Sequence, residues 1–550
     1  MLVERTPNGN LLRLASIYKR FINCNSCGVE LQSTDSHKKG YFTKCATNYH
    51  DTTKKPDMNQ IKYAMFSQDI QKLTAAHETD RQKKLESPPI CKRCNDALHQ
   101  NKYNVEDFGK FTYNEIMHNV PEQSNIMHLV SLPEFPLGLN YDLLHDKRYN
   151  VDLVLTKADQ VIGTKSTLQK EVPSFLKGFL KYHLDVITNK SLAISSVKSW
   201  NLDTLYSLLK SRTYLLGNAN AGKSSLINAL IKKYVGTRVF FDKKGNMFRN
   251  NEYEIRNMKQ HMKIHSAGVY HVPNMTRNLQ AFNINEKIVF DLPGYSNKVN
   301  TAYLENIISR DWLQQIRKTE LFDSKKIKKK HYISVKGTEN GYCYTVGGIF
   351  FLVPPKDTIN QIVSYIPGQH SKFKSIDKAL EVFSECTQPN STHPLKNFCG
   401  LTEATCDKSK FVRYVLPPFQ GSIEVVMKDI GYFLLRSTGS YEFKGFYEIW
   451  LPKGIEICIR EPLEKTIITN YRQFIDSKGK TPSCPNNRPL ISSVYPMDHN
   501  ETDISGKMKE MYLERTSHDL SGRRHRNVDT LKLVNTKSEE NHNVYWYYQW

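Results

Sequence analysis

The feature of this sequence that most restricts its fold is a short glycine-containing loop, Gly217–Ser224, which reads G-N-A-N-A-G-K-S. It fits the phosphate-loop pattern G-x-x-x-x-G-K-S without a mismatch. A strand-like run, Thr213–Leu216, precedes the loop and a helical run, Ser225–Ile231, follows it. Backbone N–H groups turned inward at a helix N-terminus favour bound phosphate. The loop therefore predicts an α/β domain with a mostly parallel sheet covered on both faces.

Two side chains of this loop have distinct expected roles. The Lys223 ammonium is expected to reach the β- and γ-phosphates, and the Ser224 hydroxyl is expected to ligate Mg²⁺. The residues expected to contact the nucleotide through this loop are Gly217, Asn218, Asn220, Ala221, Gly222, Lys223, Ser224 and Ser225.

The base of the nucleotide is predicted by a second motif, Thr156-Lys157-Ala158-Asp159. It ends the strand-like run Val151–Leu155, which we expect to open an α/β region lasting to about residue 305. The Asp159 carboxylate can accept hydrogen bonds from the guanine N1–H and exocyclic amine, which adenine does not offer. Ser195 and Ser196 close the next strand and suit a loop over the guanine O6. The prediction is GTP or GDP; ATP would require Asp159 to be accidental.

A third motif, Asp291-Leu-Pro-Gly294, follows the strand-like run Ile288–Phe290. Asp291 is expected to hold Mg²⁺ through water, and the Gly294 amide to sense the γ-phosphate. Thr276, fifteen residues before Asp291, is the candidate for a mobile threonine that completes the magnesium shell. The spacing leaves room for one hairpin between them.

Hydrolysis is less strongly indicated than binding. Tyr295 stands where many GTPases have a glutamine that orients the attacking water. The pattern resembles GTPases with a hydrophobic or aromatic replacement there, several of which use K⁺ bound by a phosphate-loop asparagine; Asn220 has that place. A cation offsets transition-state charge, so the prediction is slow, potassium-stimulated hydrolysis. The alternative is that Asn220 only shapes the loop and that turnover is negligible.

The order of the motifs is unusual, because Asp159 precedes Gly217 and Asp291 comes last. This order resembles the circularly permuted GTPases. Permutation is tolerated where the original termini are close and the new break falls in a surface loop. One consequence is that the switch after Gly294 leads directly into the C-terminal region.

Two Cys-x-x-Cys pairs, Cys24/Cys27 and Cys91/Cys94, precede these motifs. Four thiolates are the number that a tetrahedral Zn²⁺ site needs. The gap between the pairs is much longer than the usual one of about 15–20 residues, so an insertion must leave and return. The alternatives are a redox dithiol or two unrelated pairs.

Charge adds an expectation about partners. The 550 residues carry a formal net charge of +22, which favours polyanions such as RNA or an anionic membrane surface. General basicity, which is common among mitochondrial matrix proteins, is the alternative. No apolar run approaches the roughly 20 residues of a transmembrane helix. The candidate RNA-binding residues are Lys92, Arg93, Lys325, Lys326, Lys328, Lys329 and Lys330.

The first 23 residues form a basic stretch that contains one acid, Glu4, and four basic residues, Arg5, Arg13, Lys19 and Arg20. Such an acid-poor amphipathic leader is typical of a mitochondrial transit peptide, although a plain basic helix is the alternative.

A cysteine-pair module before permuted GTPase motifs resembles the YqeH and nitric-oxide-associated branch of GTPases. The C-terminal half resembles a fungal mitochondrial family in three segments, Tyr342–Pro355, Pro417–Leu435 and Tyr441–Leu463. The resemblance implies a mitochondrial location, in the matrix or at the inner membrane. It implies a role in small-subunit ribosomal RNA maturation, with pre-ribosomal RNA or the small subunit as partner. The alternative it implies is a nucleotide-binding scaffold, peripheral to the inner membrane and linked to prohibitins and lipid metabolism.

The expected organisation has four parts. They are a transit peptide over 1–22, a four-cysteine zinc-binding module with an insertion over 23–105, a circularly permuted G domain over 106–305 and an α+β C-terminal domain over 306–550, which is the expected site of RNA or partner binding.

Overall fold

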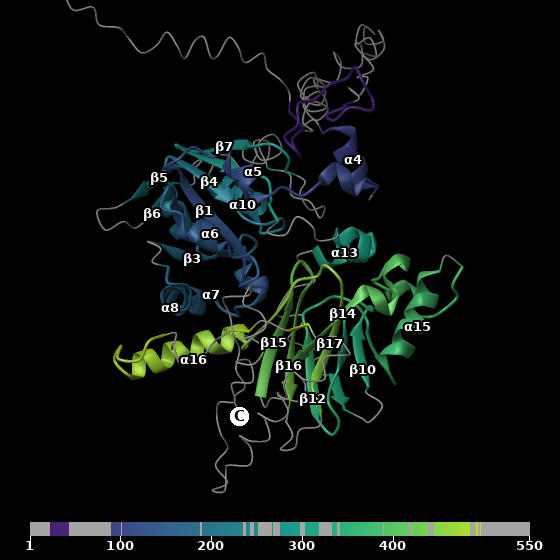
Figure 1. Ribbon diagram of the computed structural model, residues 1–550. Coiled ribbons are helices and arrows are strands. Elements are labelled where there is room, and N and C mark those ends of the chain that lie inside the picture. The colour runs from purple at the N-terminus through teal and green to yellow at the C-terminus, as the bar shows by residue number, and fades with distance from the viewer. Residues whose placement is uncertain are drawn as a thin grey trace, which may run out of the picture. The chain divides into compact units, whose positions relative to one another are not determined.

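Figure 1 shows the chain in the computed structural model. The chain divides into two compact units. Met1–Phe108 and Ser224–Pro293 form the first unit, and Gly109–Lys223 and Gly294–Trp550 form the second. The structure describes residues 23–42, 90–100, 102–186, 190–234, 238–241, 247–250, 267, 276–296, 303–317, 333–337, 342–388, 390–416, 421–437, 445–483, 491–492 and 495–496.

The second unit contains four parallel strands in the order β3-β2-β1-β4. β1 pairs with β2 along its whole length and with β4 over three residues. Six of the seven residues of β1 are buried, as expected where a parallel sheet is covered on both faces. The carboxyl ends of the four strands lie at one edge of the sheet, where the predicted base-reading and phosphate-binding motifs begin. The strands are β1 (Asn125–Ser131), β2 (Asn150–Thr156), β3 (Ser191–Ala193) and β4 (Arg212–Leu216).

The expectation that the α/β region opens at Val151 is wrong, because β1 comes earlier. Its polar His128 makes the run Asn125–Ser131 look less like a buried strand. In the structure, His128 Nε2 accepts a hydrogen bond from the Asn140 backbone N–H at 3.1 Å. Burial lowers the pKa of His128 to about 4, so the imidazole is neutral at physiological pH and is tolerated inside the sheet.

Short helices cover this sheet. α8 places Phe175, Leu176, Phe179 and Leu180 in a core with Leu153 of β2. α5 begins with a capping box in which Thr112 and Glu115 satisfy each other's backbone N–H groups. The helices are α5 (Tyr113–Met117), α6 (Tyr141–His145), α7 (Lys165–Lys170), α8 (Val172–Leu184) and α9 (Leu202–Leu208).

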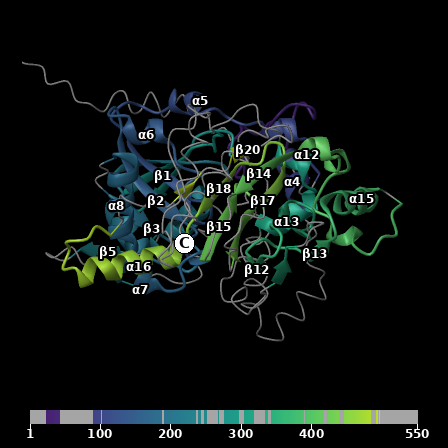
Figure 2. The same cartoon turned by 60° about the horizontal axis from the view of Figure 1, so that its bottom comes forward.

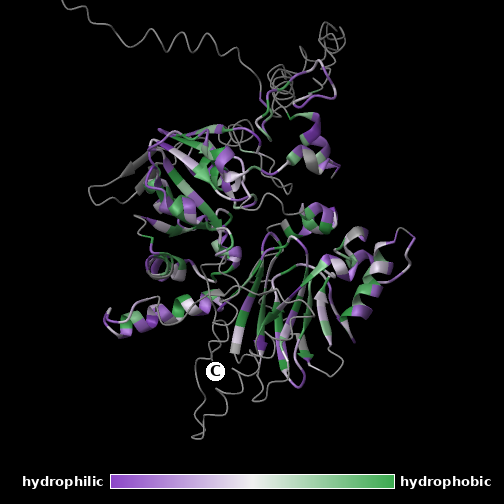
Figure 3. Cartoon of the chain, viewed as in Figure 1, coloured by the Kyte–Doolittle hydropathy of each residue, from purple (hydrophilic) through white to green (hydrophobic). Residues whose placement is uncertain are grey.

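The C-terminal part of the second unit is a sandwich of two antiparallel sheets, in the orders β13-β10-β11-β17-β14-β20 and β19-β18-β15-β16-β12-β9. One apolar core joins them, and Figure 3 shows hydrophobic residues gathered in their strands. The strands are β9 (Ile333–Lys336), β10 (Cys343–Val346), β11 (Phe351–Val353), β12 (Ile359–Ser364), β13 (His370–Phe373), β14 (Phe411–Leu416), β15 (Gly421–Met427), β16 (Gly431–Ser437), β17 (Tyr447–Pro452), β18 (Ile457–Arg460), β19 (Ile491–Ser492) and β20 (Tyr495–Pro496).

Among the described residues, four α-helices accompany the sandwich: α12 (Leu304–Ile307), α13 (Arg310–Arg317), α15 (Ile376–Thr387) and α16 (Leu463–Asp476). α13 contributes Trp312, Leu313 and Ile316 to the sandwich core, whereas α15 packs against the outer face of the first sheet. α16 lies beside α8 in Figures 1 and 2.

The sandwich packs on the α/β part of the second unit through a shared core. Val426, Tyr432 and Cys458 of the sandwich belong to one apolar cluster with Phe135 and Leu155. The buried Arg460 donates through Nε to Glu424 Oε2 at 2.7 Å and through Nη1 to the carbonyls of Leu132 and Phe135. Both apolar burial and buried hydrogen bonds therefore join the two parts.

The first unit contains the helix α4 (Lys92–His99), most of α10 (Lys223–Tyr234) and two antiparallel ribbons. In one ribbon, β7 pairs with β8 so that Gln280 lies opposite Asp291. The predicted hairpin after Thr276 is thus present. The strands of the two ribbons are β5 (Arg238–Phe241), β6 (Met247–Asn250), β7 (Gln280–Ile284) and β8 (Lys287–Asp291).

Within the part of the chain that the structure describes, no helix is both long and apolar enough to cross a membrane. The predicted transit peptide 1–22 and the lysine cluster 325–330 lie outside the described residues.

Candidate functional site

The phosphate loop Gly217–Lys223 connects β4 with the start of α10, as the sequence predicts. The Lys223 side chain is buried, and its Nζ donates to the carbonyl oxygens of Gly217 at 2.9 Å and Asn218 at 3.0 Å. A buried ammonium group is costly unless hydrogen-bonded and charge-compensated. The position therefore suits an anionic phosphate group.

Asn218 in the same loop offers a second test of fit. It is buried, and neither polar atom of its amide has a hydrogen-bond partner among the described residues. Leaving a buried polar group unpaired costs about 1–3 kcal/mol. A ligand with polar oxygens bound at this loop would remove that cost.

The predicted base-reading loop is attached directly to the phosphate loop. Thr156 Oγ1 donates to the Ala221 carbonyl at 2.6 Å. The next residue, Lys157, has a left-handed backbone with φ of 53°, which turns the chain away from β2. The Ala158 N–H then donates to the Ile194 carbonyl at 3.0 Å, which ties this loop to the one that follows β3.

Ser195 and Ser196 lie in that following loop. Ser195 is fully buried and its Oγ accepts the Lys198 N–H at 3.0 Å, whereas Ser196 and Asp159 remain partly exposed. The loops after β2, β3 and β4 thus meet at one edge of the sheet. Ligands of open α/β sheets bind outside the carboxyl ends of the strands. The structure places the predicted base-reading and phosphate-binding residues of the second unit at such an edge.

Gly294 approaches the phosphate loop so closely that a side chain would not fit. A Cβ there would lie 2.8 Å from the backbone N and Cα of Ala219. Tyr295, the next residue, is buried, and its backbone forms β-bridges with Asn218 and Phe111. Burial raises the pKa of Tyr295 well above its usual range. Its phenol packs edge-on against Tyr113 and belongs to the protein core.

The sandwich also reaches the phosphate loop, which the sequence did not indicate. The turn between β15 and β16 carries Lys428 and Asp429, and Asp429 Oδ1 accepts a hydrogen bond from Asn220 Nδ2 at 3.3 Å. Burial, reinforced by the nearby Asp429 carboxylate, raises the pKa of the Glu134 carboxyl to about 7. Glu134 follows β1 and receives the Asp429 backbone N–H. No local motif marks Glu134 or Asp429 as neighbours of this loop.

The predicted magnesium ligands lie in the first unit. Ser224 Oγ donates to Asp291 Oδ2 at 2.8 Å, so the hydroxyl and the carboxylate are near each other as the prediction requires. Asp291 is almost fully buried at the end of β8. Oxygen donors are the ligands that Mg²⁺ prefers. Thr276 lies before β7 and is half-buried.

The four cysteines come together in the first unit. Their Sγ atoms all lie within 4.8 Å of one another, and all four side chains are buried. Hydrogen bonds among the four thiols lower the pKa of Cys24 well below its usual range and raise the pKa values of Cys91 and Cys94 above theirs. A thiolate is the form that binds metal. The cluster is compatible with Zn²⁺, and the predicted proximity of the two pairs is confirmed.

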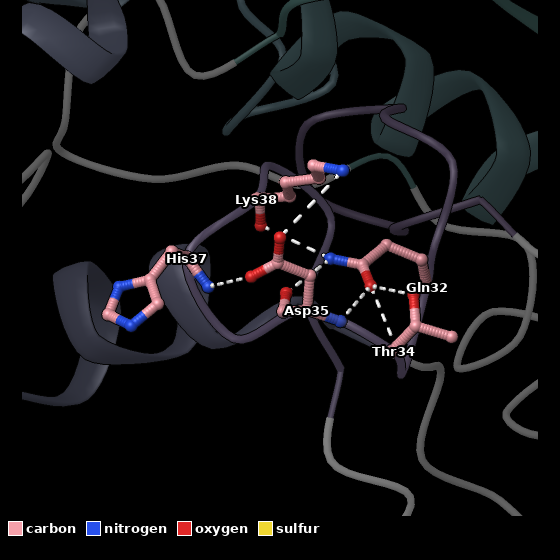
Figure 4. Close-up of polar contacts among 5 residues, drawn as sticks. All are labelled: Gln32, Thr34, Asp35, His37 and Lys38. Atoms are coloured by element: carbon pink, nitrogen blue, oxygen red, sulfur yellow. Dashed lines mark hydrogen bonds and ion pairs between the residues drawn. The ribbon is translucent and has the colours of Figure 1, made fainter.

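A polar turn brings the chain back toward the second cysteine pair (Figure 4). Gln32 Oε1 accepts the backbone N–H groups of Thr34 and Asp35, both at 2.9 Å. Asp35 in turn accepts the His37 N–H at 2.9 Å. After the turn, the Tyr41 carbonyl accepts the N–H of Lys92, next to Cys91. The described residues on either side of the insertion are thus joined by a backbone hydrogen bond at the start of α4.

The fold and these loops define a GTPase domain of the α/β phosphate-loop class. A family model described as "50S ribosome-binding GTPase" matches residues 212–334. A solved structure titled as the GDP-bound form of TM YlqF is 22% identical over 23% of this chain and 51% of that chain, with a TM-score of 0.15.

The particular family follows from the rest of the chain. Models of the N-terminal and C-terminal domains of genetic interactor of prohibitins 3 match residues 23–108 and 330–536. Proteins named "Genetic interactor of prohibitins 3, mitochondrial" are 47% identical in Zygosaccharomyces rouxii, 48% in Saccharomyces cerevisiae and 47% in Vanderwaltozyma polyspora. Each alignment covers 96% of this chain and 94–96% of the relative. The chain belongs to this family, and the names of its relatives confirm the predicted mitochondrial location.

Proposed function

We propose that the chain is a mitochondrial GTP-binding protein with a circularly permuted G domain and slow GTP hydrolysis, acting in assembly of the small ribosomal subunit. The observation that carries the nucleotide part is the hydrogen bond from Thr156 Oγ1 to the Ala221 carbonyl, at 2.6 Å. It joins the base-reading loop to a phosphate loop that comes 65 residues later in the chain. In the usual order of GTPase motifs the phosphate loop comes first.

Asp159 sets the choice of base. Its carboxylate accepts the N1–H and exocyclic amine of guanine, while Ser195 and Ser196 border the guanine O6. The buried Ser195 backbone, fixed by its bridge to Trp200, keeps this loop in place. Adenine presents no donor pair to Asp159, so the site discriminates against ATP.

Mg²⁺ is held by the Ser224 hydroxyl, with Asp291 acting through water and Thr276 completing the shell when the γ-phosphate is present. The ion neutralises charge on the β- and γ-phosphate oxygens. Lys223 binds the same oxygens, and the Gly294 amide detects the γ-phosphate.

Hydrolysis is slow because Tyr295, directly after Gly294, cannot orient water as a glutamine does; its ring is buried against Tyr113. K⁺ at the Asn220 amide oxygen supplies positive charge instead. The contact from Asn220 Nδ2 to Asp429 supports this assignment, because only the amide nitrogen can donate to a carboxylate, which leaves the oxygen for a cation.

A ribosomal partner is supported by the net charge of +22, and the candidate RNA contacts are the lysines of 325–330 with Lys92 and Arg93. Because Asp429 contacts the phosphate loop, GTP binding changes the conformation of the sandwich domain. GTP thereby sets the affinity of the protein for pre-ribosomal RNA, and hydrolysis releases the RNA. The second candidate function is a nucleotide-binding scaffold at the inner membrane; the prohibitin link in the names of the relatives favours it.

The Asp159→Asn variant tests the nucleotide assignment. It removes two charge-assisted hydrogen bonds of roughly 1.5–3 kcal/mol each, so GTP affinity falls by about 100-fold or more. Affinity for xanthosine triphosphate rises, because xanthine can accept where guanine donates. Titration with fluorescent nucleotides measures both, with the exposed Asp142→Asn as matched control. Unchanged GTP preference in Asp159→Asn would refute the assignment.

Sedimentation of mitochondrial lysates separates the two roles. Co-migration with small-subunit particles that persists in detergent supports ribosome assembly. Recovery in a detergent-sensitive membrane fraction, away from those particles, would support the scaffold and contradict the ribosomal role.

A further inference from the structure

The first cysteine knuckle, Cys24–Gly28, is hydrogen-bonded to the segment that follows Thr276. The Cys27 carbonyl accepts the backbone N–H of Arg277 at 2.9 Å and that of Asn278 at 3.4 Å. The Asn278 side chain returns a third bond, from Nδ2 to the Gly28 carbonyl at 3.3 Å. The residues next to Thr276 are therefore fixed to the backbone of a cysteine ligand.

The knuckle also packs against the strand opposite Asp291. Gly28 has φ of +76°, and a Cβ there would lie 2.8 Å from Gln280 Nε2. Gln280 begins β7 and pairs in register with Asp291 of β8, whose carboxylate accepts the Ser224 hydroxyl. A continuous set of contacts within the first unit thus runs from the cysteine cluster to the magnesium ligands.

The shape of the knuckle depends on its thiols. Its turn contains two backbone bonds, from Gly28 N–H to the Cys24 carbonyl at 2.9 Å and from Cys24 N–H to the Val29 carbonyl at 2.8 Å. The cysteines themselves make up most of its small buried cluster, together with Ala97 and Phe108. A cluster of this size gains much of its folding free energy from bound metal.

We propose that the metal-bound first knuckle holds Thr276 in place for Mg²⁺·GTP, with Asn278 and Gly28 as positioning residues. Metal at the four cysteines and Mg²⁺·GTP at Ser224 and Asp291 then stabilise each other's binding. The inference rests on the proposed magnesium role of Thr276. Thermodynamic coupling is reciprocal, so GTP raises the affinity of the cysteines for metal by the same factor by which the metal raises the affinity for GTP, and we expect this gain to appear as slower metal loss. GDP, without a γ-phosphate to engage Thr276, gives less protection.

The test uses the full-length protein with its zinc content measured. Transfer of Zn²⁺ to a chromogenic chelator is timed without nucleotide, with Mg²⁺·GDP and with Mg²⁺ and a non-hydrolysable GTP analogue. The analogue should slow transfer by about five- to 150-fold relative to GDP, the range typical of coupled affinities, if slower release accounts for the whole gain in metal affinity. Asn278→Ala should bring that ratio close to one.

Two further variants separate positioning from damage to the fold. Asn278→Asp keeps the size of the side chain but removes the donor to Gly28, and it should behave like Asn278→Ala. Asn283→Ala changes an exposed residue of β7, the strand that follows Asn278, and should keep the wild-type ratio. The positioning variants should retain one zinc and wild-type GDP affinity, which a merely destabilised protein would not.

Equal transfer rates in all nucleotide states, with nucleotide and zinc binding intact, would refute the coupling and leave the GTPase assignment untouched. A wild-type effect that survives in both Asn278 variants would refute the role of Asn278. Failure to bind guanine nucleotide would refute the proposed function itself, and titration detects that result without reference to zinc.

Discussion

The predicted phosphate-binding residues of the second unit (the phosphate-loop side) and the predicted magnesium ligands of the first unit (the magnesium side) are supported in different ways. In the second unit, the loops after β1 and β2 rest on an apolar core shared with the sandwich, reinforced by the buried Arg460, and Thr156 at the end of β2 is hydrogen-bonded to the Ala221 carbonyl of the phosphate loop. In the first unit, the segment after Thr276 is bonded to a cysteine knuckle with a small core. The first support depends on buried apolar surface, and the second depends on four thiolates and the metal they can bind.

This difference implies different sensitivities. Burial of apolar area is insensitive to chelators and redox state, so the phosphate loop should persist under conditions that disturb the knuckle. Thiolates are lost to oxidation, acid and chelation. We therefore expect the phosphate-loop side to be less sensitive to metal supply than the magnesium side.

The largest expected effect is on the phosphate-loop side, in Arg460→Ala. Removing the guanidinium leaves the Glu424 carboxylate uncompensated in a buried site, which costs about 3–5 kcal/mol. The urea midpoint of the second unit, followed by tryptophan fluorescence, should fall accordingly. Substituting both partners, Arg460→Met with Glu424→Leu, should restore much of the loss.

The matched control is Arg436→Ala, an exposed arginine on β16, for which a change within about 0.5 kcal/mol is expected. Similar losses in Arg460→Ala and Arg436→Ala would show that the buried pair does not join the two parts of the second unit.

An intermediate effect is expected on the magnesium side, in Gly28→Ala. A left-handed backbone costs a residue with a side chain about 1–2 kcal/mol, and the new Cβ must also displace Gln280. Zn²⁺ should transfer to a chelator faster than in the wild type. Gly479→Ala shares the backbone conformation, with φ of +79°, but its Cβ would have ordinary contacts of 3.7 Å. If both variants lose zinc at the same rate, the knuckle contact with Gln280 is unimportant.

The smallest expected effect concerns pH at the Glu134–Asp429 contact, where Lys157 and Lys428 are the nearby cations. Because the folded-state pKa of Glu134 is raised to about 7, its stabilising contribution is complete below about pH 4.5 and is lost as pH rises through 7. Glu134 is partly exposed, so the loss should be about 1 kcal/mol. Unfolding midpoints between pH 5 and 8 should show a shallower slope in Glu134→Gln than in the wild type. Equal slopes in Glu134→Gln and the wild type would contradict a stabilising role of the protonated Glu134.

The sequence predicted those parts of the site whose chemistry is local. Gly217–Ser224, Thr156–Asp159 and Asp291–Gly294 each carry their function in neighbouring residues, and the structure places them after the strands expected. The cysteine pairs were also predictable, because thiolate number and spacing restrict the geometry even across a long insertion. The individual site roles remain predictions.

The contacts between the sandwich and the G domain were not predictable in this way. Asn220 and Asp429 are 209 residues apart, and Arg460 meets the Leu132 carbonyl across 328 residues. Such contacts depend on the packing of two complete domains, and no local pattern encodes them. β1 was missed for a different reason, because a neutral buried histidine interrupts its apolar pattern.

The shared core has a consequence for how this protein can change over evolutionary time. Apolar residues of the G domain are covered by Val426, Tyr432 and Cys458 of the sandwich. A gene fragment that encodes either part alone would therefore produce a protein with an exposed apolar, aggregation-prone surface. Recombination that exchanges one part for an unrelated domain would disrupt the same shared core. We therefore expect the two parts to be inherited together, and a single substitution in the shared core to be tolerated best when it conserves volume.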